Sequence, residues 1–220
     1  MHRTVQNLNV IKKFIISHLE DQSINKIPKI IAVSKTFSME KILPLIEYGH
    51  IDFGENKVQE AIEKWQEIKK DFNHLQLHMI GKLQTNKVKF AVPLFDYIHS
   101  LDSLKLAKKI SEEQNKIKKR LKIFIQINIG NEEQKNGIDE SNLNEFYNSC
   151  VNDLDLDIIG LMCLPPKENE SKKFFLKMKN LAENLNIHEL SMGMSNDYLD
   201  ATNNGSTFLR IGTKIFGNRG

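Results

Sequence analysis

Residues 30 to 36 read IIAVSKT, an apolar run that ends in a lysine. The four residues Ile30–Val33 form a continuous apolar stretch, which is typical of a strand buried on both faces in a parallel sheet. Lys35 follows almost directly, although lysine is seldom buried without a partner. A strand that ends in this way indicates either a lysine amine that takes part in function or one that is paired with another group.

Short apolar runs of this kind alternate along the chain with longer amphipathic ones. Strands are predicted at Ile30–Ser34, Ile51–Phe53, Leu77–Ile80, Tyr97–His99, Leu121–Ile129, Asp157–Met162, Glu189–Met192 and Phe208–Ile211. Helices are predicted between them at Met39–Tyr48, Lys57–Lys70, Asn86–Phe90, Ser103–Lys119, Leu143–Asn152, Ser171–Asn184 and Asp197–Asn203. Strands that alternate with helices favour a parallel sheet of right-handed βαβ units.

Eight strands and seven intervening helices are the elements of a (β/α)8 barrel without its last helix. Nine residues follow Ile211, too few for a normal eighth helix, whereas the amphipathic segment Val5–Leu19 precedes the first strand. We therefore predict an α/β fold in which residues 1–220 form a single TIM-like (β/α)8 barrel domain. The extra N-terminal helix would cover the place of the eighth. A doubly wound sheet is the alternative.

Composition and charge argue against several classes of function. The chain has a net charge of +3 and is 27% charged, so its charge is mixed rather than polybasic. The densest basic run, Lys116–Lys122, has no interleaved aromatic residues, so we expect no nucleic-acid binding. Cys150 and Cys163 are not spaced as metal ligands or as a disulfide framework. With neither a signal peptide nor a bilayer-crossing stretch, a soluble, cytoplasmic protein is expected, with no metal and no membrane partner.

The carboxyl ends of the strands are where a barrel of this kind places its functional site. Lys35 stands at the first of them, where partial burial lowers the pKa of an amine and favours the neutral form that attacks an aldehyde. The alternative is a lysine that reaches to water or pairs with a carboxylate.

The loops after the seventh and eighth strands read SMGMSND, residues 191 to 197, and RIGT, residues 210 to 213. Backbone N–H groups and hydroxyls in such loops bind anions, and Gly212 lets the backbone approach a ligand closely. Each loop alone could be an ordinary glycine turn with a capping serine. Together with Lys35 they predict a site for a phosphorylated aldehyde.

Arg210 alternates with Leu209 and Ile211 on a short strand, so it points to the other face from its neighbours. If it points inward, it lies close to the ligand. A guanidinium keeps its proton, so opposite a pyridine nitrogen it would donate a hydrogen bond and leave that nitrogen unprotonated. The ring would then be a weaker electron sink. The alternative is an ion pair at the barrel rim.

Three more strand ends are polar: FGENKVQE (53 to 60), HMIGKLQTNK (78 to 87) and QINIGNEEQKNG (126 to 137). Side chains from them that could converge on one pocket are Asn56, His78, Gln84, Asn86, Asn128 and Lys135. Each could equally be a cap, a turn residue or a satisfied core residue. GKLQT lacks the glycine spacing of a phosphate-binding P-loop.

The motifs AVSKT, FGENKVQE, HMIGKLQTNK, GLM, LSMGMSND and RIGTKIFGNR stand in this order over residues 30 to 219. With them the chain resembles the pyridoxal phosphate homeostasis protein family. The resemblance implies a barrel like the N-terminal domain of bacterial alanine racemase, with pyridoxal 5′-phosphate as its cofactor. By position in the motifs, the implied cofactor-binding residues are Lys35 as the Schiff base, Ser191, Ser195, Gly212 and Thr213 at the phosphate, Arg210 at the pyridine nitrogen, and Asn56, Met162 and His78 near the ring.

The resemblance further implies a carrier or regulator in intracellular pyridoxal phosphate homeostasis, with little or no turnover and no catalytic residue. Apoenzymes that use the cofactor are the expected partners, and the chain is expected to be a monomer. Two departures from the family pattern are Lys57 after FGEN and a short loop over Cys163–Lys173. The short loop bears on access to the site.

Two other functions remain open at this stage. A small amino acid racemase would need an acid or base on each face of the substrate carbon, with His78 or a tyrosine as the second. Lys35 supplies only one face, and only nine residues follow the eighth strand. A Schiff-base aldolase without a cofactor would keep the lysine and the phosphate loops but leave Arg210 unexplained.

Overall fold

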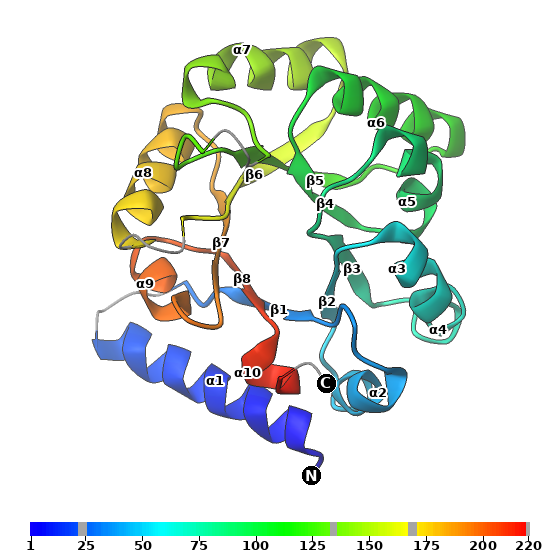
Figure 1. Cartoon of the computed structure of the whole chain (residues 1–220), viewed down its shortest axis with the longest axis vertical. Helices are drawn as coiled ribbons and strands as arrows, with labels where there is room; N and C mark the ends of the chain where they lie inside the picture. Colours follow the sequence, from blue (N-terminus) through cyan, green and yellow to red (C-terminus); the bar gives the residue numbers. More distant parts are fainter. Residues whose placement is uncertain (22–25, 133–135, 167–170, 219–220) are drawn as a thin grey trace.

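Eight parallel strands form a closed barrel, in which each strand pairs with the next along the chain and the last pairs with the first. This computed structural model describes all residues except 22–25, 133–135, 167–170 and 219–220. The strands are β1 (Lys29–Val33), β2 (Asp52–Glu55), β3 (Gln76–Met79), β4 (Tyr97–Leu101), β5 (Lys122–Ile127), β6 (Asp157–Cys163), β7 (Glu189–Met194) and β8 (Phe208–Ile211). Figure 1 shows them around the centre with the helices outside. The predicted barrel is confirmed, and the doubly wound sheet is wrong.

The helices follow the predicted order, with some differences in their bounds. They are α1 (Arg3–Asp21), α2 (Met39–Glu47), α3 (Val58–Trp65), α4 (Ile68–Asp71), α5 (Val88–Leu94), α6 (Leu104–Ile117), α7 (Leu143–Asn148), α8 (Ser171–Asn184), α9 (Tyr198–Asn203) and α10 (Thr213–Phe216). The single helix predicted over Lys57–Lys70 is interrupted at Gln66 and Glu67, which are both exposed, so no core packing holds the helix together there. Over the described ranges, none of these helices combines the length and apolarity needed to cross a bilayer.

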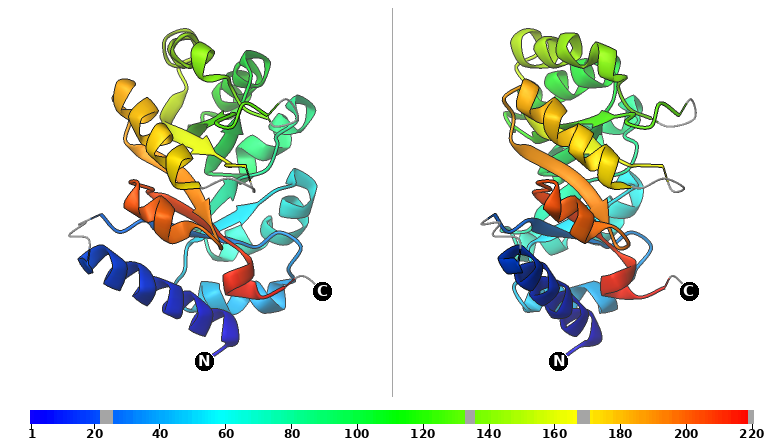
Figure 2. Two further views of the ribbon diagram at one scale, coloured as in Figure 1. Left: turned by 60° about the vertical axis from the view of Figure 1, so that its left-hand side comes forward. Right: turned by 90° about the vertical axis from the view of Figure 1, so that its left-hand side faces the viewer.

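Helix α1 occupies the place that an eighth barrel helix would take. It packs against α2, α9 and α10, and Figure 2 shows it lying along the outside of the barrel. Its buried apolar side chains are Val5, Leu8, Ile11, Ile15 and Leu19, spaced so that they form one face of the helix. The predicted role of the extra N-terminal helix is confirmed.

The barrel has two separate apolar regions. The larger lies between the strands and the surrounding helices, and the smaller is the cluster of Ile31, Tyr97, Phe124, Met162 and Phe208. Side chains alternate along each strand, so residues next to these five face the helices instead. Only every second residue of a strand therefore points into the barrel.

Shortening Leu8 tests whether α1 is part of the barrel core. Because Leu8 is fully buried, Leu8→Ala is expected to lower the free energy of unfolding by about 2–5 kcal/mol in urea denaturation. Phe14→Ala on the same helix is the matched control, since Phe14 is 59% exposed. Equal losses from the two substitutions would show that α1 is not held by its buried face.

Candidate functional site

Four neighbouring strands carry most of the predicted site residues at their carboxyl ends. Lys35 follows β1, Asn56 follows β2, Ser195 follows β7 and Gly212 follows β8. Because the barrel is closed, β7, β8, β1 and β2 are adjacent, so these residues lie along one arc of the barrel mouth. All four are half-buried, while Thr213 next to Gly212 is exposed.

The loops after β7 and β8 contact each other. The backbone N–H of Lys214 donates to Oγ of Ser195 over 3.5 Å, which joins the two loops at the start of α10. Gly193, near the end of β7, has a φ of +89°, and a Cβ there would lie 2.5 Å from the Cβ of Ala201, so this position requires glycine. The arrangement gathers hydroxyls and N–H groups of a helix start, which are donors that suit a phosphate.

The turn that carries Lys35 is fixed by two charged residues of α3. Nζ of Lys64 donates to the backbone oxygen of Ser34 over 2.9 Å, and the Glu60 carboxylate accepts from the N–H of Thr36 over 2.5 Å. Thr36 has a φ of 66°, a left-handed conformation that is unfavourable for a β-branched residue. These hydrogen bonds with charged side chains therefore hold a turn that the local sequence alone would not favour.

A fully buried carboxylate links this turn to the barrel wall. Oε1 of Glu55, on β2, accepts from Ser34 Oγ over 2.7 Å and from Trp65 Nε1 over 3.0 Å. Lys64 forms ion pairs with both Glu55 and Glu60, at 2.9 Å and 2.8 Å. Sequence reasoning missed Glu55, Glu60 and Lys64. Their signal was the (i, i+4) spacing of Glu60 and Lys64 just after FGEN.

Arg210 is inside the barrel and only 4% exposed. Its Nη1 donates to Oγ of Ser191 over 2.6 Å, and its Nη2 donates to the backbone oxygen of Cys163 over 2.7 Å. Burial lowers the pKa of Arg210, but a guanidinium remains charged in a protein. A fixed positive charge therefore lies within the barrel, on the strand that leads to Gly212.

Met162 and Asn56 lie close to the same end of the barrel. Met162 is fully buried in the interior cluster, and its register partners are Gln126 on β5 and Ser191 on β7. Asn56 packs on Gly81, where a Cβ would lie 2.4 Å from the Asn56 backbone oxygen. Gly81 thus lets the loops after β2 and β3 approach each other.

The structure gives His78 and Ser191 a different environment from the one expected. Both are fully buried, and each bonds to His99. The Ser191 hydroxyl is occupied by Arg210 and His99, so it is separate from the donors gathered around Ser195. His78 hydrogen-bonds to Asp52, at the amino-terminal end of β2. Sequence reasoning assigned no role to Asp52 or His99.

The other candidates that the structure describes follow β3 and β5. Gln84 and Asn86 are exposed, and Asn128 bonds to the backbone of Glu132 in a local turn. Lys135 lies outside the described residues.

A family model for the alanine racemase N-terminal domain matches residues 16–220. The closed barrel with a lysine just after its first strand is thus a barrel of that class, as expected from the sequence. The more specific relationship follows from the individual relatives.

The chain is 38% identical to the pyridoxal phosphate homeostasis protein of Haemophilus influenzae, over 97% of this chain and 94% of the relative. It is 36% identical to the protein of that name from Escherichia coli, over 86% and 85% of the two chains. The chain belongs to the pyridoxal phosphate homeostasis protein family. The structure is similar to that of PipY from Synechococcus elongatus with PLP bound, with a TM-score of 0.81 and 32% identity over 92% of this chain and all of PipY.

Substituting Glu60 tests the support of the Lys35 turn. Burial acts to raise the pKa of Glu60, but the hydrogen bonds from Lys64 and Thr36 hold it below the ordinary value of 4.5. The carboxylate therefore stabilises the fold at neutral pH, and this contribution is lost as the pH falls below about 4.5. Glu60→Gln is expected to lower the free energy of unfolding by about 1 kcal/mol at pH 7, and by less in acid.

Glu63→Gln is the matched control, since Glu63 is on the same helix and exposed. Urea denaturation at pH 7 and near pH 3.5 measures both variants. An equal effect of Glu60→Gln at the two pH values would contradict a role for its charge.

Proposed function

We propose that this chain is a single barrel domain that binds pyridoxal 5′-phosphate through Lys35 as a Schiff base. Its role would be intracellular pyridoxal phosphate homeostasis, with little or no turnover. The observation that carries the proposal is the placement of a lysine after β1, on the same arc of the barrel mouth as hydroxyls and N–H donors after β7 and β8. The names of the relatives and the PLP-bound PipY structure support it.

The residues present fit this cofactor. When bound, it supplies an aldehyde that condenses with an amine, together with a phosphate and a pyridine ring. Lys35 would provide the amine, while Ser195, Gly212 and Thr213 would hold the phosphate. The described hydrogen bonds of Arg210 use its two terminal nitrogens, and its Nε–H is not among those donors. That N–H is suited to face the ring nitrogen.

A carrier role is favoured over racemisation by the surroundings of His78. A racemase would need a second acid or base beside Lys35, and His78 was one candidate. Both ring nitrogens of His78 are engaged, one with Asp52 and the other with His99. Its ring also stacks on Tyr97 with a centroid distance of 4.2 Å. A side chain held in this way is poorly placed to exchange protons with a substrate.

The proposal extends to partners and location. We expect a cytoplasmic monomer that passes the cofactor to apoenzymes. A barrel mouth with a reversible bond to Lys35 would release the cofactor more readily than a closed site. Such a transfer is measured by adding an apoenzyme to the loaded chain and following the recovery of its activity. Borohydride reduction of the loaded chain beforehand should prevent this recovery.

Chemical trapping tests the site directly. Borohydride reduction after addition of pyridoxal phosphate is expected to leave one cofactor adduct, on Lys35, because this lysine is next to the phosphate-binding loops. Peptide mapping by mass spectrometry identifies the modified residue. Lys35→Ala should abolish the specific adduct.

Lys82→Ala is the matched control, because Lys82 is an exposed lysine in the loop after β3. It should keep the Lys35 adduct. Comparable labelling of many lysines, or a persistent single adduct in Lys35→Ala, would contradict the proposed site. Measurement of amino acid racemisation by the loaded chain then separates a carrier from an enzyme.

A further inference from the structure

A continuous series of hydrogen bonds crosses the interior of the barrel. Oδ1 of Asp52 lies 3.0 Å from Nε2 of His78, and Nδ1 of His78 lies 2.9 Å from Nε2 of His99. Nδ1 of His99 lies 2.8 Å from Oγ of Ser191, which is 2.6 Å from Nη1 of Arg210. We call these five residues the interior chain. It starts at the amino-terminal end of β2 and ends at Arg210, one residue from the end of β8.

The two ends of the interior chain set the direction of every hydrogen bond in it. The Asp52 carboxylate can only accept, so Nε2 of His78 carries a proton. A neutral His78 then accepts at Nδ1 from the Nε2–H of His99. His99 in turn accepts at Nδ1 from the Ser191 hydroxyl, and the Ser191 oxygen accepts from Arg210. All donors therefore point away from Arg210 and toward Asp52.

The charge states required by this direction agree with the surroundings of each group. Burial lowers the pKa of His78 and of His99, which keeps both imidazoles neutral at pH 7. Burial acts to raise the pKa of Asp52, but the hydrogen bond from His78 and the charge of Lys29 hold it below its usual value. The interior chain thus has one negative and one positive end, joined by three neutral groups.

Arg210 depends on this chain for its orientation. In the described part of the structure, no carboxylate forms a direct ion pair with Arg210, although the charge of Asp197 acts on it through space. Its acceptors are the Ser191 hydroxyl and one backbone oxygen. Hydrogen bonds in a series polarise one another, so the carboxylate at the far end strengthens the bond that Arg210 makes.

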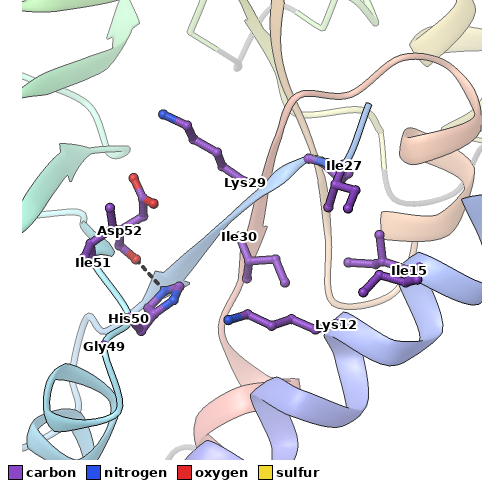
Figure 3. Close-up of a pocket in the computed structure, with 11 residues that line it drawn as sticks. Lys12, Ile15, Ile27, Lys29, Ile30, Gly49, His50, Ile51 and Asp52 are labelled. Atoms are coloured by element: carbon purple, nitrogen blue, oxygen red, sulfur yellow. Dashed lines mark hydrogen bonds between the residues drawn. The ribbon is translucent and has the colours of Figure 1, made fainter. Parts of the chain in front are cut away.

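The far end of the interior chain lies at the opposite mouth of the barrel. Asp52 is part of the wall of a pocket of about 280 Å³ that is lined mainly by α1 and by the residues leading into β1 and β2. Figure 3 shows Asp52 beside His50 on one wall, with Lys12 and Ile15 of α1 opposite. His50 bonds to the backbone oxygen of Asp52 over 2.9 Å and takes no part in the chain.

We infer that Asp52, His78, His99 and Ser191 are positioning residues that orient and polarise the Arg210 guanidinium at the ring of the bound cofactor. This inference rests on the proposed function for the identity of the ligand. Ring electronics and affinity would then depend on a carboxylate at the opposite end of the barrel. Four hydrogen bonds separate that carboxylate from Arg210.

The direction of the chain is measurable in the full-length protein without any cofactor. Nitrogen-15 NMR of the imidazoles at pH 7 is expected to show His78 and His99 neutral, each with its proton on Nε2. An imidazolium at either position, or a proton on Nδ1 of either ring, would overturn the inference. This measurement needs no variant that could fail to fold.

Two substitutions test the effect on the cofactor. Ser191→Ala removes the acceptor next to Arg210 and is expected to weaken pyridoxal phosphate binding about tenfold. Asp52→Asn keeps an acceptor for His78 but removes the charge, so a smaller loss, about threefold, is expected. Both should shift the absorption maximum of the bound cofactor in the same direction, with Ser191→Ala giving the larger shift.

His50→Gln is the matched control, because it changes another buried histidine beside Asp52 without breaking the chain. It should leave the spectrum and the affinity unchanged. Ser191→Ala and Asp52→Asn could instead lower stability but leave the absorption spectrum of the bound cofactor unchanged. The interior chain would then have only a structural role, and the inference would fail. If the unsubstituted protein formed no Lys35 adduct, the proposed function would fail instead. The NMR result would still report on the interior chain, because it needs no cofactor.

Discussion

Polar side chains that point into a closed barrel must find their partners inside it. The eight strands enclose these side chains, and an unpaired buried polar atom costs about 1–3 kcal/mol. Arg210 makes this constraint acute, because its charge is almost fully buried. The hydrogen bond to Ser191 satisfies one of its donors, and that bond in turn requires His99, then His78, then Asp52. One inward arginine thus accounts for much of the polar content of the barrel interior.

The mouth of the barrel is organised by a different set of charges. There a lysine and a glutamate of α3 hold the turn that carries Lys35, while Glu55 ties the same turn to β2. These contacts lie outside the ring of strands, between β1 and the helix layer. The described contacts that hold the Lys35 turn are therefore separate from those that hold Arg210. A change in one can leave the other intact.

The sequence was sufficient for the fold and for part of the site. All eight strands overlap the predicted ones, because short apolar stretches stand out between amphipathic helices. The bounds differ where a strand contains polar residues: β2 is Asp52–Glu55, whereas Ile51–Phe53 was predicted. Residues directly after strands, such as Lys35 and Gly212, could be placed at the mouth for the same reason. Placing these residues requires only the positions of the strand ends and the order of the strands in a barrel.

The interior chain could not be predicted in this way. Its members come from five strands, and which side chains meet depends on the register and on local irregularities between them. The pairing of β4 with β5 shifts between Ile98 and Leu101, around His99. The sequence alone also does not show whether a histidine in a strand contacts a ligand or other side chains. His78 was therefore assigned to the ligand, whereas the geometry places it between Asp52 and His99.

The length of the interior chain has a physical consequence for Arg210. A carboxylate in direct contact would take two of its N–H donors in a bidentate pair and would offset its charge at short range. Instead, one hydroxyl and one backbone oxygen accept from the guanidinium, the Asp197 carboxylate acts on it only through space, and the Asp52 carboxylate lies four hydrogen bonds away. The guanidinium keeps its positive field and an N–H for a ligand, while its orientation is still fixed. A neutral series of groups therefore does what a direct ion pair would not: it positions the charge without cancelling it.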